Sequence, residues 1–262
     1  MTETDSKERF TERVENYVLY RPDYPAEALD YLYGAAGLQP DSEIADVGAG
    51  TGKFSKLLLA RGSRVTAVEP NEAMRTAADQ ALGKDHRYRS VPGSAEDTGL
   101  PASSVDFIVC AQAFHWFDRR LAQAEFARIL KPGGRAVLIW NSRLTHGTPF
   151  LEEYDKLLHV YAADYAAVSH KNISEVALGQ FFQSGSMQVA RFPYRQLFDY
   201  EGLRGRLLSS SYAPAEGHPN HEPMLAELRQ IFDRNAQEGR ISFEYETEVY
   251  SGEVGEASSA GI

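Results

Sequence analysis

Short apolar runs and segments of helical periodicity alternate along the first half of the chain. Between the runs, apolar residues recur every three or four positions, as they do on the buried face of a helix. Asn71 and Asp118 stand where they could cap two of these helices, because their side-chain oxygens accept backbone N–H groups. The apolar runs predict buried strands at residues 44–47, 64–68, 105–111 and 135–140, and a further strand is expected at 88–91. Strands that alternate with helices in this way predict a doubly wound, mostly parallel α/β sheet.

The pattern changes after Asn141. Residues 142–185 and 199–239 have the periodicity of helices separated by loops. Two further strands are expected at 188–198 and 241–250, and the second of them alternates polar and apolar residues cleanly. The predicted sheet therefore has seven strands, with helical insertions between the later ones.

Composition adds constraints on the class of protein. The 262 residues suffice for one α/β domain, and a hydrophobic content of 43% is ample for a packed core. The formal net charge of −10 disfavours a nucleic-acid partner, because phosphate binding needs a basic surface. No run approaches about 18 apolar residues, and the N-terminus has no apolar signal region, so we expect a cytoplasmic protein without membrane contact. The single cysteine, Cys110, excludes an intrachain disulfide and a multi-cysteine metal site, and no metal is expected.

The first predicted strand leads directly into three glycines at alternate positions, Gly48, Gly50 and Gly52, and a helix follows. A strand, a glycine turn and a helix place backbone N–H groups and a helix N-terminus against a ligand. Glycine suits this turn because a Cβ would hold a ligand away from the main chain and disfavour positive φ values. The dinucleotide fingerprint would need its third glycine at Lys53, and a Walker A loop would need Ser or Thr at Phe54. Both nucleotide motifs are therefore rejected, and a purely structural turn remains the alternative.

An acidic residue downstream supports a ligand site at this turn. Glu69 ends the second predicted strand, about 20 positions after Gly48. A carboxylate at that spacing is placed to accept two hydrogen bonds from a ribose diol. We therefore expect Glu69, which Pro70 follows, to bind the ribose of a nucleoside-containing cofactor.

The run from Asp46 to Gly52 resembles the first motif of class I S-adenosylmethionine-dependent methyltransferases. Further segments extend the resemblance over most of the chain, to a subfamily similar to trans-aconitate methyltransferase that acts on small molecules. These segments are Phe10, 21–25 (Arg-Pro-Asp-Tyr-Pro), 69–70, 93–96 and 111–118. The resemblance implies a Rossmann-like fold, S-adenosylmethionine as cofactor and S-adenosylhomocysteine as product.

The resemblance also implies which positions bind the cofactor. These are Arg21, Asp46, Gly48, Ala49, Gly50, Gly52, Glu69, Pro70, Ser94, Ala95, Glu96, Ala111, Gln112 and Trp116. Asp46 would order the turn, and Arg21 would pair with the cofactor carboxylate, because a guanidinium fork matches a carboxylate. A solvated arginine is the alternative for Arg21. Many relatives have Asp where Ser94 stands, and a capped turn is the alternative to an adenine contact there.

The run from Gln112 to Asp118 follows the fourth predicted strand, beside the expected position of the methyl group. Trp116 or Phe114 would cover the adenine or face the sulfonium, which an aromatic face attracts. His115 is the candidate catalytic residue, because an imidazole can accept a proton near neutral pH. The alternative is that His115 packs or binds substrate, because methylation of a carboxylate needs alignment but no base.

We therefore expect a methyltransferase that acts on a small-molecule acceptor, at oxygen of a carboxylate or a hydroxyl. One alternative is a protein or RNA methyltransferase. The acidic charge disfavours RNA, and the fourth strand lacks the Asn/Asp-Pro-Pro-aromatic motif of amino-methylating relatives. The other alternative is a non-catalytic regulatory protein that binds S-adenosylmethionine, with its cleft filled by its own side chains.

We expect a single domain over residues 1–262, of unknown oligomeric state. Its cofactor-binding core spans about 38–141, three segments form a cap over the active site, and a polar C-terminal tail is disordered. The cap segments are 1–30, 142–185 and 199–239, and the tail is 251–262.

Overall fold

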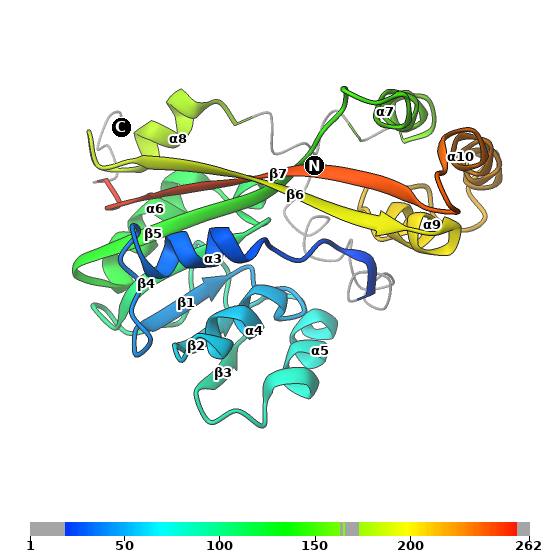
Figure 1. The fold of residues 1–262 in the computed structure, drawn as a ribbon. Helices are drawn as coiled ribbons and strands as arrows, with labels where there is room; N and C mark the ends of the chain where they lie inside the picture. The colour runs from blue at the N-terminus through cyan, green and yellow to red at the C-terminus, as the bar shows by residue number, and fades with distance from the viewer. Residues whose placement is uncertain (1–18, 163–164, 166–172, 256–262) are drawn as a thin grey trace, which may run out of the picture.

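A seven-stranded sheet forms the centre of the computed structural model, which describes residues 19–162, 165 and 173–255 (Figure 1). The strands are β1 (Glu43–Val47), β2 (Arg64–Val68), β3 (Tyr88–Val91), β4 (Val105–Ala111), β5 (Leu130–Arg143), β6 (Gln188–Phe198) and β7 (Ile241–Gly252). Their order is β3-β2-β1-β4-β5-β7-β6. The first five pair in parallel, and β7 lies antiparallel between β5 and β6. The predicted seven-stranded, mostly parallel sheet is confirmed.

Helices cover both faces of this sheet (Figure 1). They are α3 (Ala26–Tyr33), α4 (Lys53–Ala60), α5 (Glu72–Leu82), the 3-10 helix η2 (Phe114–Trp116), α6 (Arg119–Ile129), α7 (Pro149–Tyr161), α8 (Glu175–Phe181), α9 (Tyr200–Leu208) and α10 (His221–Asn235). One apolar core joins α3, α4 and α5 to the sheet, and a second joins η2, α6 and α8 to the opposite face. Within the described ranges, no helix is long and apolar enough to cross a membrane.

Two predicted helix caps are present. The Asn71 side chain accepts a hydrogen bond from the backbone N–H of Met74 at 3.0 Å. Asp118 Oδ1 accepts from Arg120 and Leu121 in the same way, each at 3.0 Å. These contacts satisfy N–H groups that the first turn of a helix leaves without a helical partner.

The fifth strand is longer than the predicted 135–140. Leu130 already pairs with Val105, and regular pairing resumes where Arg135 faces Phe107. The intervening Lys-Pro-Gly-Gly residues, 131–134, form an irregularity within β5 instead of a turn before it. A sequence rich in turn residues is compatible with such a bulge, in which extra residues leave the ladder without ending the strand.

The prediction of a disordered tail from residue 251 is wrong for residues 251–255. Ser251 pairs with Val137 on one side and with Gln188 on the other, so β7 continues beyond the predicted end. Val254 then forms an isolated bridge with Phe182. Small polar residues lack the apolar signal of a strand, but backbone pairing on both edges holds them. Residues 256–262 lie outside the described residues.

A third apolar cluster lies at the far end of β6 and β7, where α7, α9 and α10 gather (Figure 1). Phe150, Tyr154, Leu203, Leu228 and Phe243 are buried in it. The two later cap segments predicted from the sequence supply these helices, and we call the cluster the cap.

The N-terminal cap segment predicted at 1–30 is described only from Leu19 onward. Tyr20 packs on α9 so closely that a Cβ on Gly205 would lie 2.2 Å from its ring. Arg21 donates from Nη2 to the carbonyl oxygen of Ser209 at 3.0 Å. The described part of this segment therefore crosses from the cap to α3.

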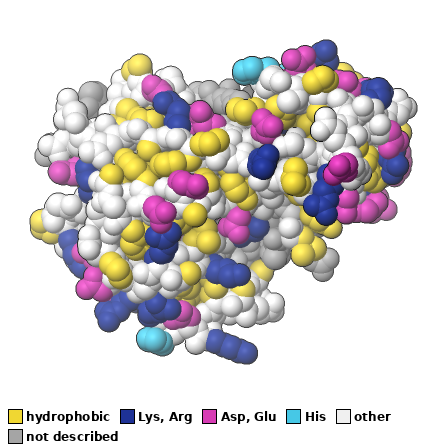
Figure 2. All heavy atoms as spheres, viewed as in Figure 1, with side chains coloured by type: hydrophobic (Ala, Val, Ile, Leu, Met, Phe, Trp, Pro, Cys, Tyr) yellow, Lys and Arg dark blue, Asp and Glu magenta, His cyan; other side chains and the backbone are white. Residues whose placement is uncertain are grey.

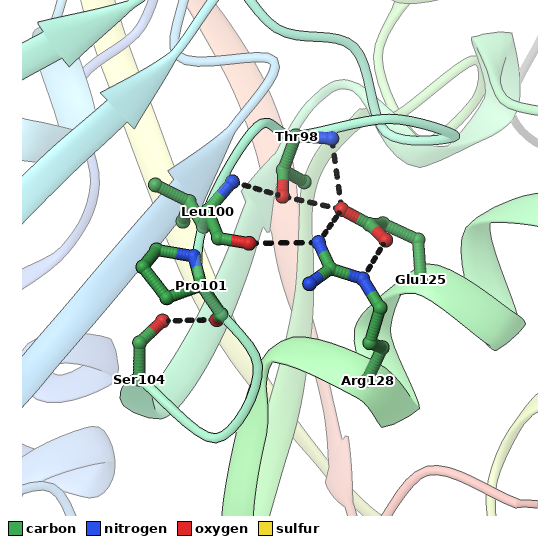
Figure 3. A network of polar contacts seen from close by, with 6 residues as sticks. All are labelled: Thr98, Leu100, Pro101, Ser104, Glu125 and Arg128. Carbon is green, nitrogen blue, oxygen red and sulfur yellow. Dashed lines mark hydrogen bonds and ion pairs between the residues drawn. The ribbon is translucent and has the colours of Figure 1, made fainter.

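A polar network fixes the loop between β3 and β4 (Figure 3). Glu125 Oε1 on α6 accepts from Thr98, at 2.9 Å from its N–H and 2.5 Å from its hydroxyl. Arg128 donates to Glu125 Oε2 at 2.7 Å and to the carbonyl oxygen of Leu100 at 2.8 Å. Burial alone would raise the pKa of Glu125, but Arg128 and Thr98 lower it below its usual value. This network anchors the loop between β3 and β4 to α6. The same loop carries Ser94, Ala95 and Glu96, which are predicted to contact the adenine of the cofactor.

Candidate active site

The glycine turn connects β1 to α4, and all three glycines have left-handed φ values: +72° at Gly48, +56° at Gly50 and +76° at Gly52. A Cβ on Gly48 would lie 2.5 Å from Ala113 Cβ, and one on Gly52 would lie 2.7 Å from Leu82 Cδ1. Those two glycines are therefore needed for packing within the protein. A Cβ on Gly50 would meet nothing within 4 Å in the described part of the chain. The main chain at Gly50 borders open space, as a turn that receives a ligand requires.

Asp46 is completely buried behind this turn. Its Oδ2 accepts from the Ser55 hydroxyl at 2.6 Å, which links the end of β1 to the first turns of α4. Burial raises the pKa of Asp46 to about 7, and the negative charge of Glu69 adds to this. Asp46 thus supports the turn from behind, and it does not line the cavity beside Gly48.

Glu69 lies at the end of β2 and its carboxylate is held against the turn. Oε2 accepts from the N–H of Gly50 at 2.8 Å, and Oε1 accepts from the N–H of Asn71 at 2.9 Å. Burial raises the pKa of Glu69, although both N–H groups and Arg75 act in the opposite direction. Each carboxylate oxygen has a further lone pair, which suits the expected ribose diol. Pro70, beside it, is exposed.

A cavity of about 40 Å³ lies beside Gly48. Its walls come from the N-terminal segment, the glycine turn, α4, the ends of β4 and β5, and α9. The lining residues are Arg21, Pro22, Tyr24, Gly48, Ala49, Lys53, Phe54, Ala111, Gln112, Asn141 and Arg206. Five predicted site residues are therefore brought together here. Gln112 has a φ of +59°, and non-glycine residues held in that region are found preferentially at functional sites.

Arg21 lies at this cavity and also joins two elements. Besides the bond to Ser209, the C-cap residue of α9, its own carbonyl oxygen accepts from Lys53 Nζ at 2.7 Å. These contacts show that Arg21 is not simply a solvent-exposed arginine, which was the alternative interpretation. Its pairing with a cofactor carboxylate stays a prediction.

The predicted adenine-edge residues form a turn. The N–H of Ser94 donates to the carbonyl oxygen of Asp97 at 2.9 Å, and Ala95 is buried. Glu96 Oε1 accepts from the N–H of Asp118 at 2.9 Å. A backbone hydrogen bond therefore closes this turn, and both a cap within it and contact of these residues with an adenine stay predictions.

His115 and Trp116 lie in η2, after β4. Their rings are 4.9 Å apart and tilted by 40°. Trp140 Nε1 on β5 donates to His115 Nδ1 at 3.3 Å. Neighbouring strand residues face opposite sides of a sheet, so Trp140 contacts His115 while Asn141 lines the cavity. The roles of His115 and Trp116 in catalysis and cofactor binding stay predictions.

Sequence reasoning missed Arg206 as a site residue. It is 5% exposed, and it follows Leu203 by three positions and precedes Leu207, both of which are fully buried. An arginine on the apolar face of a predicted helix is unusual, because a buried charge needs a partner. That pattern could have marked Arg206 as unusual, but the sequence alone does not show which cavity the helix faces.

Residues 45–138 match the family model of a methyltransferase domain. This match covers the glycine turn, Glu69 and the run from Ala111 to Asp118, and the sheet has the expected seven strands. The chain is a class I S-adenosylmethionine-dependent methyltransferase, and S-adenosylmethionine is its methyl donor.

Similar proteins carry the same description. An uncharacterized methyltransferase-like protein of Schizosaccharomyces pombe is 29% identical over 97% of this chain and 98% of its own length. An uncharacterized methyltransferase of Mycobacterium bovis is 42% identical over 51% of this chain, which spans about half (52%) of that relative. A solved structure described as a type II methyltransferase, from Anaeromyxobacter dehalogenans, matches with a TM-score of 0.70 and 25% identity, over 89% of this chain and 98% of that one. These three descriptions give no acceptor, and the subfamily similar to trans-aconitate methyltransferase stays a prediction.

Proposed function

We propose that the protein transfers the methyl group of S-adenosylmethionine to an oxygen atom of a small-molecule acceptor. The observation that carries this proposal is the cavity beside Gly48, which is small, at about 40 Å³, and is walled by Arg21 from the N-terminal segment and Arg206 from the cap. A cavity covered by side chains at the ends of parallel strands suits a small ligand. A polypeptide or an RNA strand would need a more open approach.

The described residues fit the cofactor. The backbone at Gly50 leaves room for it, and the fixed Glu69 carboxylate can accept from the ribose hydroxyls. Arg21, which lines the cavity, is the residue that we assign to pair with the methionine carboxylate of the cofactor. The cofactor supplies a methyl group on a positively charged sulfur, so the chain itself needs to align the acceptor and exclude water.

The contact between Trp140 and His115 favours a carboxylate over a hydroxyl acceptor. An indole N–H can only donate, so Nδ1 of His115 is an acceptor and the neutral ring carries its proton on Nε2. In that tautomer His115 can donate a hydrogen bond from Nε2, whereas a hydroxyl acceptor would require a base there. A carboxylate is already ionised and requires none.

The surface gives little support to the RNA alternative. On the face drawn in Figure 2, Lys and Arg side chains are interspersed with Asp and Glu and do not form one continuous basic area. The formal net charge of −10 acts in the same direction. The cavity beside Gly48, whose lining includes the polar side chains of Arg21, Lys53, Gln112, Asn141 and Arg206, supports catalysis over the regulatory alternative.

Incubation with methyl-labelled S-adenosylmethionine and a panel of small acids and phenols tests the proposal. We expect label in a small product that alkali releases as methanol, the behaviour of a methyl ester. The Glu69→Ala variant serves as a control for dependence on the cofactor site. Binding of S-adenosylhomocysteine without any transfer, or transfer only to protein or RNA, would contradict the proposal.

A further inference from the structure

Arg206 is a buried arginine with only neutral partners among the described residues. Nε donates to the Tyr245 hydroxyl at 3.0 Å, and Nη1 donates to the Ser210 hydroxyl at 3.0 Å. The guanidinium carbon lies 5.5 Å from the Phe243 ring centroid. No Asp or Glu in the described part of the chain forms an ion pair with it, and its Nη2 makes no hydrogen bond there. A buried charge without a counter-ion is costly, so the side chain is suited to receive an anion.

Arg143 provides a comparison within the same molecule. It is 8% exposed, close to the 5% of Arg206, but its Nη2 forms an ion pair with Asp155 at 2.5 Å. For Arg143, the chain thus supplies a carboxylate from α7. Arg206 has none, and unlike Arg143 it lines the cavity beside Gly48.

The cavity contains more positive charge than the cofactor can balance. Arg21, Lys53 and Arg206 line it, and none of the lining residues is acidic. The three cations share one environment: burial lowers the pKa of Lys53, Asp23 raises it, and the charges of Arg21 and Arg206 lower it again. The methionine end of S-adenosylmethionine offers one carboxylate, together with an ammonium and a sulfonium. That carboxylate can balance one of the three cations, so balancing another would require a second anion.

Neutral hydroxyl groups surround Arg206 on its cap side. The Tyr154 side chain is fully buried, and its hydroxyl has no hydrogen-bond partner among the residues that the structure describes. Burial would raise the pKa of Tyr212, but the charges of Arg206 and Arg143 lower it below its usual value, so its hydroxyl lies in their positive field. Phenolic hydroxyls donate to a carboxylate without adding charge. The surroundings of Arg206 therefore complement a carboxylate in both charge and donors.

We infer that the methyl acceptor is a small carboxylic acid and that Arg206 binds its carboxylate, which makes Arg206 the residue that selects an anionic acceptor. The inference rests on the proposed methyl transfer to oxygen. An arginine presents two parallel N–H groups to a carboxylate, and the Nη2 group of Arg206 remains for that contact.

The transfer balances without a base. A carboxylate oxygen forms the new C–O bond as the S–CH₃ bond breaks, and the electron pair of that bond stays on sulfur. The negative charge of the acid and the positive charge of the sulfonium are both lost, and the products are a methyl ester and S-adenosylhomocysteine. No proton leaves the acceptor.

The test measures acid binding separately from cofactor binding. Protein saturated with S-adenosylhomocysteine is unfolded thermally with mono-, di- and tricarboxylic acids and with the corresponding amides, at one ionic strength. We expect at least one acid to raise the Tm while its amide does not. Arg206→Gln should remove this rise and change the Kd for S-adenosylhomocysteine by less than about threefold, and Arg206→Lys should retain part of it. Arg204→Gln, on the same helix, is the matched control and should change neither quantity.

Each other outcome is decisive. Equal effects of acids and amides, or an acid effect that Arg206→Gln retains, would overturn the inference. Loss of S-adenosylhomocysteine binding in Arg206→Gln with an unchanged circular dichroism spectrum would assign Arg206 to the cofactor carboxylate instead. If Arg206→Gln does not fold, the comparison of acids with amides on the unaltered protein decides. Acid binding that depends on Arg206, without methyl transfer to any acid, would support the anion site and contradict the proposed function.

Discussion

Trp140 donates from Nε1 to Nδ1 of His115 at 3.3 Å, and this contact fixes which imidazole nitrogen carries the proton. Nδ1 is the acceptor, so the neutral ring is protonated on Nε2. Protonation of Nδ1 would break the bond to Trp140. The strand that ends at the active site thus holds the histidine in a form that donates hydrogen bonds.

We expect His115→Ala to lower kcat by less than about tenfold, because loss of a positioned base would cost about 10²–10⁴. The pH–rate profile should stay flat through the range in which a histidine titrates. Nitrogen NMR of the unaltered protein should find the Nε2–H tautomer of His115, and Trp140→Phe should shift the balance toward Nδ1–H. A fall in rate toward acid pH that His115→Ala abolishes would instead identify a base and a hydroxyl acceptor.

Gly50→Ala should weaken binding of S-adenosylhomocysteine by about tenfold or more, because a Cβ would occupy the space left for the ligand. The protein should still fold, because that Cβ would meet no atom of the described residues within 4 Å. Gly37→Ala is the matched control: Gly37 also has positive φ, at +92°, and open space around its Cβ position. Both variants should lose about 1 kcal/mol of stability. If titration calorimetry gives them the same affinity, Gly50 does not contact the ligand.

Glu69→Ala should weaken cofactor binding by tenfold or more, because each hydrogen bond to a charged group contributes about 1.5–3 kcal/mol. Part of this loss will come from the turn, since Gly50 and Asn71 also lose their acceptor. Glu72→Ala, at an exposed carboxylate on the adjacent helix, is the control. Calorimetric titration with S-adenosylhomocysteine and with adenosine separates the two contributions, and unchanged affinity for both would remove Glu69 from the site.

Asp46→Asn should make stability less dependent on pH. The native pKa of Asp46 is about 7, against 3.8 for an ordinary aspartate, so the folded state binds a proton between these values that the unfolded state does not. Its contribution to stability is therefore complete below about pH 4 and is lost as pH rises toward 7. The free energy of unfolding of Asp46→Asn relative to the unaltered protein should rise across this window in urea denaturation. An Asp41→Asn control, at an exposed site, should show no such trend, and a flat difference for Asp46→Asn would contradict the assignment.

The sheet and the glycine turn could be predicted because their signals are local. In the buried strand 105–111 every residue except Asp106 is apolar, and Asn71 directly precedes the helix that it caps, α5. The start of β5 could not be predicted, because it is defined by the pairing of Leu130 with Val105 on β4. The sequence of one strand does not show which residues of another strand it will pair with. Arg206 was missed for a related reason: Gly48 and α9 are far apart in the chain, and only folding brings them to one cavity.

β6 and β7 run without a break from the main sheet into the cap. Phe243 packs with α7, α9 and α10, whereas Val249 and Tyr250, on the same strand, pack against the two faces of the main sheet. The cap therefore shares its strands with the main sheet and is not a separate unit on a linker. The cap contributes Arg206 of α9 to the cavity, so substitutions in α9 can change the cavity wall and leave the residues of the glycine turn unchanged. In evolution, substitutions in the cap could therefore change which acceptor is methylated, while the methyl donor stays the same.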